Sequence, residues 1–327
     1  MRARLALLSE LPGEWARRAA LWARLNRLRR GEVDGEPAPD RNDEYFFYQT
    51  VLGAWPLDLG PEDASGLEAF AARVQATMTK AVREAKERSS WSNPNAAYEA
   101  VLTRFVAGAL DGSRPNPFVA DMHGFVARLA RPGAINSLAQ TLVKLAAPGV
   151  TDTYQGGELW DFSMVDPDNR RAIDWQLRRS LLAELARRFG VGEVDRQAFA
   201  ELAAQWRDGR EKLFLTWRAL ALRAVAPALF AGGAYRPLAT SGRHAERLCA
   251  FARIADGRIA VAVVPRLVLP LLGEGGAIDW SDTSVALPKA DAWRDVLAQR
   301  PLGRRDGTVA AAELLADFPV ALLASGA

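Results

Sequence analysis

The sequence predicts a mixed α/β chain that is mostly helical and ends in a small β-rich domain. Apolar residues recur at helical spacing in one segment after another up to about residue 230. From Tyr235 onward the apolar runs are short and rich in β-branched residues, and turn residues such as Asp256 and Gly257 separate them. We therefore expect residues 1–232 to form one domain and residues 233–327 another.

The expected helices share apolar residues three or four positions apart, the spacing that places them on one face. They fall at 15–28, 67–82, 98–106, 118–129, 135–145, 175–189 and 211–223, and one more begins at Asp43 as its N-cap. Pro148 and Gly149 end the helix over 135–145, and a short strand is expected near 149–154. In the last part of the chain, "CAFARI" and "RIAVAVV" flank Asp256 and Gly257 and predict a hairpin.

Composition excludes several classes of protein. The net charge is only +3, and the arginines of residues 17–30 alternate with apolar residues as on an amphipathic helix, so we expect no nucleic-acid binding. One cysteine, Cys249, precludes an intramolecular disulfide and suits a reducing compartment. Two histidines and that cysteine are too few for a His/Cys metal site, and we expect no metal and no cofactor. No apolar run reaches the length of a membrane span, so a cytoplasmic location is the expectation.

The segment "DTYQGGELWDFSMVDPDNRR", residues 152–171, has neither strand nor helix periodicity and is rich in aromatic and charged residues. Tyr154 offers a flat apolar face, while Gln155 and Glu158 offer directional hydrogen-bonding groups. This combination suits a hydroxyl-rich ligand such as a sugar. The alternative is a polar loop that covers a sheet and uses its carboxylates as helix caps.

The second half of this segment contains a turn signature, Asp-Pro-Asp-Asn, followed by two arginines. Asp168, Asn169, Arg170 and Arg171 are candidate ligand residues if the turn lies at the mouth of a site. Otherwise the arginines pair with the neighbouring acids. Earlier in the chain, "DRNDEYFFYQ" places Arg41 and Asn42 just outside the helix expected from Asp43, and both are further candidates.

Several of these segments carry a resemblance to a known family. "GVTDTYQGGE" is similar to the G-x-P-x-x-Y-x-G-x-E stretch after the eighth barrel strand of the α-amylase superfamily, with Thr151 in place of proline. Together with "DRNDEYFFYQTVLGAWP" and "SWSNPNAAYE", the longer string "YQGGELWDFSMVDPDNRR" resembles the maltooligosyltrehalose synthases. The similarity spans the chain, although Ala172 stands where that family has proline.

The resemblance implies a fold in which residues 1–232 are the last part of an α-amylase-type (β/α)8 barrel with a helical insertion. The segment near 149–154 would be its last strand, and residues 233–327 would form a small β-sandwich-like domain. Such a barrel needs eight parallel strands in about 250 residues. Periodicity finds hardly any strand before residue 232, so most of the barrel would be missing.

The resemblance also implies a function: retaining, intramolecular transfer that converts the reducing-end α-1,4 linkage of a maltooligosaccharide into an α,α-1,1 linkage. In the family, the three catalytic carboxylates lie before the stretch that matches "RARLALLSELP", so no catalytic residue is expected here. The expected substrate-binding residues are Tyr154, Gln155 and Glu158, then Asp168, Asn169, Arg170, Arg171, Arg41 and Asn42.

The implied partners are a maltooligosaccharide and the missing N-terminal barrel portion. Two alternatives stay open. One is a non-catalytic maltooligosaccharide-binding or assembly module. The other is a fragment of an α-amylase-type hydrolase, in which Glu158 and Asp161 would be the candidate pair of carboxylates.

Overall fold

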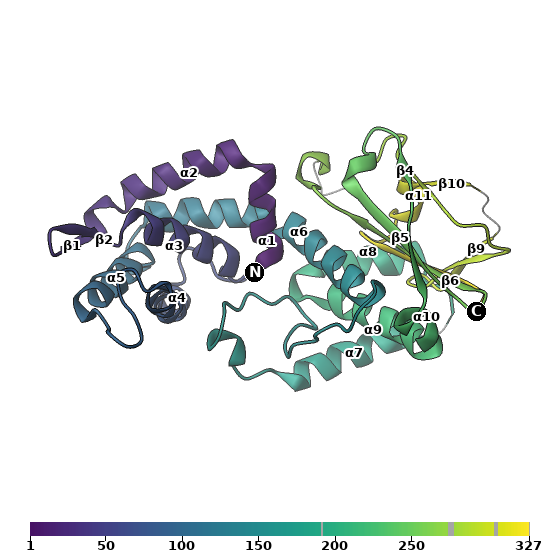
Figure 1. Ribbon diagram of the computed structural model, residues 1–327, viewed down its shortest axis with the longest axis horizontal. Helices are drawn as coiled ribbons and strands as arrows, with labels where there is room; N and C mark the ends of the chain where they lie inside the picture. The colour runs from purple at the N-terminus through teal and green to yellow at the C-terminus, as the bar shows by residue number, and fades with distance from the viewer. Residues whose placement is uncertain (191, 274–277, 304–306, 327) are drawn as a thin grey trace. The chain divides into compact units, whose positions relative to one another are not determined.

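The computed structural model describes residues 1–327 except 191, 274–277, 304–306 and 327. The chain forms two compact units (Figure 1). Unit 1 comprises residues 1–133 and 162–172, and unit 2 comprises residues 134–161 and 173–327. The change from helices to strands near residue 233 falls inside unit 2, because the helices that precede it pack in the same unit. A domain boundary at residue 232 therefore stays a prediction.

Unit 1 is mainly helical, with one short hairpin. Its elements are α1 (Arg2–Leu5), η1 (Ala6–Glu10), α2 (Pro12–Leu25), η2 (Arg27–Arg29), β1 (Gly31–Val33), β2 (Glu36–Ala38), α3 (Arg41–Ala54), α4 (Ala64–Ala85), α5 (Ala96–Ala109), the first part of α6 (Pro117–Ala146) and η3 (Asp168–Arg170). Every helical segment expected from the sequence in this region overlaps an observed helix. No helix of the described residues is long and apolar enough to cross a membrane.

Trp22, on the apolar face of α2, lies at the centre of the core of unit 1. Its side chain is wholly buried, and its ring centroid lies 5.6 to 6.0 Å from those of Tyr48, Phe118 and Phe125. The indole Nε1 donates to the carboxylate of Asp121 at 2.7 Å, so its one polar group is satisfied. The amphipathic pattern predicted over 15–28 is thus confirmed for Trp15 and Trp22, but α2 ends at Leu25, and Leu28 beyond it is 91% exposed.

Two expectations about the segment before α3 are wrong. The N-cap is Asp40 rather than Asp43: the carboxylate of Asp40 accepts from the backbone N–H of Asp43 at 2.9 Å. The helix therefore begins at Arg41, and Arg41 and Asn42 lie in its first turn instead of outside it.

Residues 31–38 form the β1–β2 hairpin because Asp34 and Gly35 take the positive φ angles of a tight hairpin turn.

The two helices expected over 118–129 and 135–145 are one helix, α6, with Pro132 in its interior. A proline there costs a hydrogen bond and about 3 kcal/mol. Leu129, Ile135 and Leu138, on both sides of the proline, are nearly or fully buried. Burial of these side chains offsets the cost and keeps the helix continuous.

Unit 2 contains helices and two antiparallel sheets. Its further elements are α7 (Trp175–Phe189), α8 (Arg196–Ala204), η4 (Trp206–Asp208), α9 (Arg210–Val225), α10 (Pro227–Ala231), β3 (Ala234–Pro237), β4 (Thr240–Ser241), η5 (Ala245–Arg247), β5 (Leu248–Ala255), β6 (Arg258–Pro265), η6 (Leu269–Leu271), β7 (Ser284–Ala286), β8 (Trp293–Asp295), β9 (Arg300–Gly303), β10 (Thr308–Ala310), α11 (Ala311–Leu314) and β11 (Ala321–Ser325). The larger sheet has the order β3-β5-β6-β11-β8-β9 and the smaller one β10-β7-β4.

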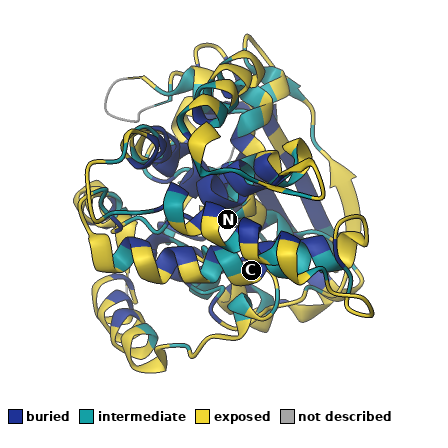
Figure 2. Cartoon of the chain, turned by 90° about the vertical axis from the view of Figure 1, so that its left-hand side faces the viewer, coloured by how far each residue is buried: buried dark blue, intermediate teal, exposed yellow. Residues whose placement is uncertain are grey.

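The central strands of the larger sheet of unit 2 are buried on both faces, whereas its edge strand β3 is exposed. Its central strands β5 and β6 form the predicted hairpin around Asp256 and Gly257. Alternate side chains point to opposite faces of a strand. Phe251 therefore packs with the helices, whereas Val261 packs with residues of the smaller sheet. The central strands are coloured as buried in Figure 2.

The strand expected near 149–154 is not formed. Residues 151–154 have no regular secondary structure, and Val150 is fully exposed. A barrel strand takes its hydrogen bonds from a neighbouring strand on each side, and every strand pair among the described residues is antiparallel and lies elsewhere. Without such neighbours the segment stays irregular, and a place in a parallel barrel stays a prediction.

Buried arginines satisfy the carbonyl groups at several helix ends. Arg253, on β5, is 1% exposed, and its guanidinium donates to the carbonyls of Ala146 at 3.3 Å, Phe230 at 3.0 Å and Gly233 at 2.8 Å. These carbonyls end α6 and α10. The last carbonyls of a helix have no partner within it and carry partial negative charge, so a guanidinium both satisfies and stabilises them.

We expect Arg253→Met to lower the free energy of unfolding of the chain by about 3 kcal/mol, because it leaves buried carbonyls without a donor. The matched control is Arg258→Met: Arg258 caps Val225 at the end of α9 from an exposed position, so its loss should cost about 0.5 kcal/mol. Urea unfolding followed by circular dichroism measures both variants. Equal losses would contradict the capping role of Arg253.

Candidate functional site

The first half of the candidate segment is a tight loop in unit 2. The backbone N–H of Gly157 donates to the carbonyl of Tyr154 at 3.1 Å, which closes a turn. Gly156 has φ of +86°, and a Cβ there would lie 2.9 Å from Ile173, so the position requires glycine. At the start of this turn Tyr154 is 44% exposed, and Gln155 is also exposed. Both side chains are therefore available to a ligand.

The far end of the loop is fixed to the helices of unit 2. The indole Nε1 of Trp160 donates to the carbonyl of Trp206 at 2.6 Å. The ammonium of Lys212, on α9, donates to the carbonyl of Leu159 at 3.1 Å. Burial lowers the pKa of Lys212 to about 8, although the charge of Asp161 acts in the opposite direction. A lysine held this way fixes the backbone of the loop.

Glu158 is largely a structural residue. Its carboxylate accepts from Nε of Arg178 at 2.9 Å, and Arg178 also donates to the carbonyl of Gly156 at 3.2 Å. The guanidinium therefore ties the two sides of the loop together. Glu158 is 24% exposed in its side chain, so part of it still faces solvent.

The second half of the segment is a turn in unit 1 that is anchored by Asp168. Its carboxylate accepts two hydrogen bonds from Arg73 on α4, at 2.8 and 2.9 Å, and one from the backbone N–H of Met164 at 2.8 Å. Burial alone would raise the pKa of Asp168, but the hydrogen bonds and charge of Arg73 outweigh it and hold this pKa below its ordinary value. Asp168 is thus engaged in holding the turn.

Asn169 differs from its neighbours in having an unused polar atom. Its Oδ1 is buried, and within the described part of the chain it has no hydrogen-bond partner. Arg170 pairs with Asp166 at 2.5 Å, and Arg171 lies 3.2 Å from Asp168, while both arginines remain more than half exposed. A buried acceptor without a donor is rare, and burial also closes this oxygen to a ligand, so a ligand role for Asn169 stays a prediction.

Arg41 and Asn42 lie on a different element from the turn. Both are exposed in the first turn of α3. The structure therefore leaves them accessible, and a role beside the turn stays a prediction for both residues.

Raised pKa values mark candidate proton donors, and they occur outside the candidate segment. Burial raises the pKa of Asp43, to which the Tyr98 hydroxyl donates at 2.5 Å. Burial also raises the pKa of Asp295, which accepts from the backbone N–H groups of Leu297 and Ala298. Both carboxyl groups are engaged by their local structure. Within the described residues, no group of three or more His, Cys, Asp or Glu side chains could hold a metal ion.

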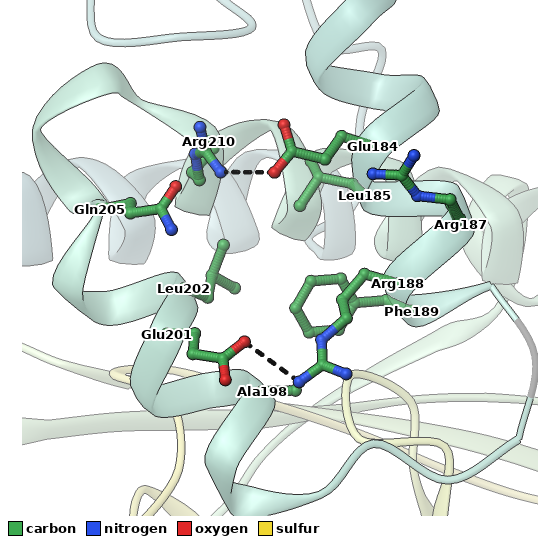
Figure 3. Close-up of a pocket in the computed structure, with 10 residues that line it drawn as sticks. All are labelled: Glu184, Leu185, Arg187, Arg188, Phe189, Ala198, Glu201, Leu202, Gln205 and Arg210. Carbon is green, nitrogen blue, oxygen red and sulfur yellow. Dashed lines mark hydrogen bonds and ion pairs between the residues drawn. The ribbon is translucent and has the colours of Figure 1, made fainter.

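Unit 2 also contains a pocket of about 210 Å³ that the sequence did not reveal (Figure 3). Its floor includes Leu185 and Leu202, and two ion pairs cross it: Arg188 with Glu201 at 3.1 Å, and Arg210 with Glu184 at 3.0 Å. The helical period identifies the buried leucines of α7, whereas α8 was not among the helices expected from the sequence. It does not show that the two helices leave a space between them.

Comparisons with known proteins agree with the resemblance seen in the sequence. No family model matches the chain. A Mycobacterium tuberculosis protein described as a maltooligosyl trehalose synthase is 35% identical over 324 residues, which cover 99% of this chain and 35% of that protein. The chain thus spans about a third of the length of the curated relatives that it matches.

Solved structures give the same result. The maltooligosyltrehalose synthase from Arthrobacter ramosus is 34% identical with a TM-score of 0.72, and the match covers 99% of this chain and 36% of that one. Another structure described as maltooligosyl trehalose synthase is 25% identical with a TM-score of 0.72, over 99% of this chain and 37% of that one. The predicted resemblance is confirmed, and the fold is that of the C-terminal part of these synthases.

We expect Asp168→Asn to lower the free energy of unfolding by about 2 kcal/mol at neutral pH, because it leaves the half-buried guanidinium of Arg73 without its charge partner. The pKa of Asp168 is lower in the folded chain than in the unfolded chain. Its contribution is therefore complete above the unfolded value of about 3.9 and is lost as the pH falls through the folded value. Urea unfolding at a series of pH values should show the gap between variant and wild type closing in acid.

The matched control for this measurement is Asp166→Asn. Asp166 pairs with Arg170 on the same turn, but the two side chains are 42% and 69% exposed, so the loss should be under about 1 kcal/mol. A stability gap for Asp168→Asn that stays constant into acid would show that the carboxylate charge is not what holds the turn.

Proposed function

We propose that this chain is the C-terminal portion of a trehalose-forming glucosylmutase. The whole enzyme would convert the reducing-end α-1,4 linkage of a maltooligosaccharide into an α,α-1,1 linkage by retaining, intramolecular transfer. The observation that carries the proposal is the 35% identity with a described maltooligosyl trehalose synthase over 99% of this chain. The single cysteine, Cys249, is consistent with a cytoplasmic location.

On this proposal the bond-breaking carboxylates lie outside the chain. A retaining transfer needs a nucleophile and a proton donor with carboxyl groups about 5 to 5.5 Å apart. In the candidate segment, Glu158 and Asp168 are held by Arg178 and Arg73. For Asp168 the hydrogen bonds and charge of Arg73 hold the pKa below its ordinary value, which makes this carboxyl group a poor proton donor. Both residues therefore act as positioning residues.

The contribution of this chain would be to hold sugar and exclude water. The exposed ring of Tyr154 can stack on the C–H face of a glucose unit, and Gln155 beside it can bond the hydroxyls. Asn169, which is half-buried on the turn, stays a predicted ligand residue of the same proposal. A rigid loop that keeps water from the reaction favours transfer over hydrolysis.

A second candidate function is assembly with a further polypeptide. Helix α7 exposes three apolar side chains: Trp175 at 48%, Leu177 at 45% and Leu182 at 37%. Only one face of this helix, with Leu181, Leu185 and Phe189, is buried. An exposed apolar surface of this kind commonly marks a place where another chain or domain packs. The partner that fits the first proposal is the other two thirds of such a synthase.

We expect the isolated chain to bind maltopentaose and Tyr154→Ala to weaken this binding about fivefold to tenfold, because the substitution removes the stacking surface. Isothermal titration calorimetry measures the affinity, with cellopentaose as the control ligand. The matched control is Tyr235→Ala, since Tyr235 is exposed to a similar extent, 48%, on β3 of the same unit.

Equal affinity of the wild type and of Tyr154→Ala for maltopentaose would contradict the role given to the loop. A loss of the same size in Tyr235→Ala would show that the effect is not specific to Tyr154.

A further inference from the structure

Trp91 is an exposed tryptophan outside the loop and the turn described above. It lies in the connection between α4 and α5 (Figure 1) and is 58% exposed. Tryptophan usually buries most of its large apolar surface. An exposed indole in a structured segment therefore needs an explanation.

The indole ring of Trp91 has a cation on one side. The guanidinium carbon of Arg83 lies 4.9 Å from the ring centroid, within the range of a cation–π contact. Arg83 is fixed in turn by Glu99 through two hydrogen bonds of 2.7 and 2.6 Å. The ring therefore rests on a half-buried ion pair while much of its own surface remains accessible.

Hydrogen bonds also fix the backbone that carries Trp91. The hydroxyl of Ser89 donates to Glu99 at 2.5 Å and accepts from the backbone N–H of Asn95 at 3.0 Å. The hydroxyl of Ser90 accepts from the backbone N–H of Asn93 at 2.9 Å. A ring held in place before binding loses little conformational entropy when a ligand stacks on it.

The surroundings of the ring favour a sugar over a protein partner. The residues that follow it, Ser92 and Asn93, are exposed and polar. A protein hot spot is typically a packed cluster of apolar side chains within an interface of about 1,600 Å². One aromatic face beside hydroxyl and amide groups instead matches a pyranose ring, whose faces are apolar and whose edges carry hydroxyls.

We propose that Trp91, supported by Arg83 and flanked by Ser92 and Asn93, is a second carbohydrate-binding platform that stacks a glucose unit of an α-1,4-glucan. The choice of an α-1,4-glucan rests on the proposed function; the platform itself rests on the geometry of Trp91. Such a platform binds glucan independently of the loop with Tyr154.

Native gel electrophoresis of the full chain in gels that contain glycogen tests this proposal. Glycogen should retard the wild type, and Trp91→Ala should weaken the apparent association with glycogen by about fivefold or more. Trp91→Phe keeps an aromatic face and should retain most of the retardation. The matched control is Tyr235→Ala, which removes an aromatic ring of 48% exposure from β3 and should leave the retardation unchanged.

Urea unfolding of Trp91→Ala should match the wild type, so that lost binding cannot be ascribed to lost structure. Unchanged retardation of Trp91→Ala in glycogen, or a wild type that no glucan retards, would overturn the platform. Retardation by barley β-glucan alone, abolished in Trp91→Ala, would support the platform and contradict the α-glucan chemistry of the proposed function. The calorimetric test with Tyr154→Ala addresses the proposed function separately.

Discussion

The arrangement of this chain depends on guanidinium groups that satisfy the carbonyls at helix ends. In unit 1, Arg4 is almost fully buried and donates to the carbonyls of Leu52 and Trp55 at the end of α3, and burial lowers the pKa of this arginine to about 9. In unit 2, Arg253 and Arg223 donate to the last carbonyls of α6. Helix ends without such donors would leave buried polar groups unsatisfied. The arginine-rich composition thus has a structural cause.

Charged side chains that bind carbonyl groups or carboxylates also fix the segments that carry the candidate ligand residues. The end of α6 is fixed by arginines, and the loop that follows is fixed by Arg178 and Lys212. In unit 1, Arg73 holds the turn through Asp168. In these contacts the charged side chains hold the backbone of the loop and of the turn in place, and none of them is assigned a role in breaking a bond. Among the uncharged groups, they leave the ring of Tyr154 and the amide of Gln155 exposed to a ligand. A sugar can stack on the first and form hydrogen bonds with the second.

Local patterns in the sequence predicted most helices and the β5–β6 hairpin, because burial of a periodic face and tight-turn chemistry are local properties. Tertiary interactions decided the rest. Burial of Leu129 and Ile135 kept α6 continuous through Pro132. The family resemblance pointed to residues 152–171 as the candidate segment. It could not predict that Asp168 pairs with Arg73, because the two residues are 95 positions apart and the pattern within the turn says nothing of the partner. The strand expected near 149–154 is absent because a strand needs neighbours that this part of the chain does not supply.

The central claim is that the chain holds sugar but supplies neither nucleophile nor proton donor for breaking a glycosidic bond. The most direct test measures the loss of reducing ends from maltopentaose. One sample contains the chain alone, and another contains it mixed with the part of the Arthrobacter ramosus synthase that it does not match. We expect reducing ends to persist with the chain alone and to disappear in the mixture. Their disappearance with the chain alone would contradict the account.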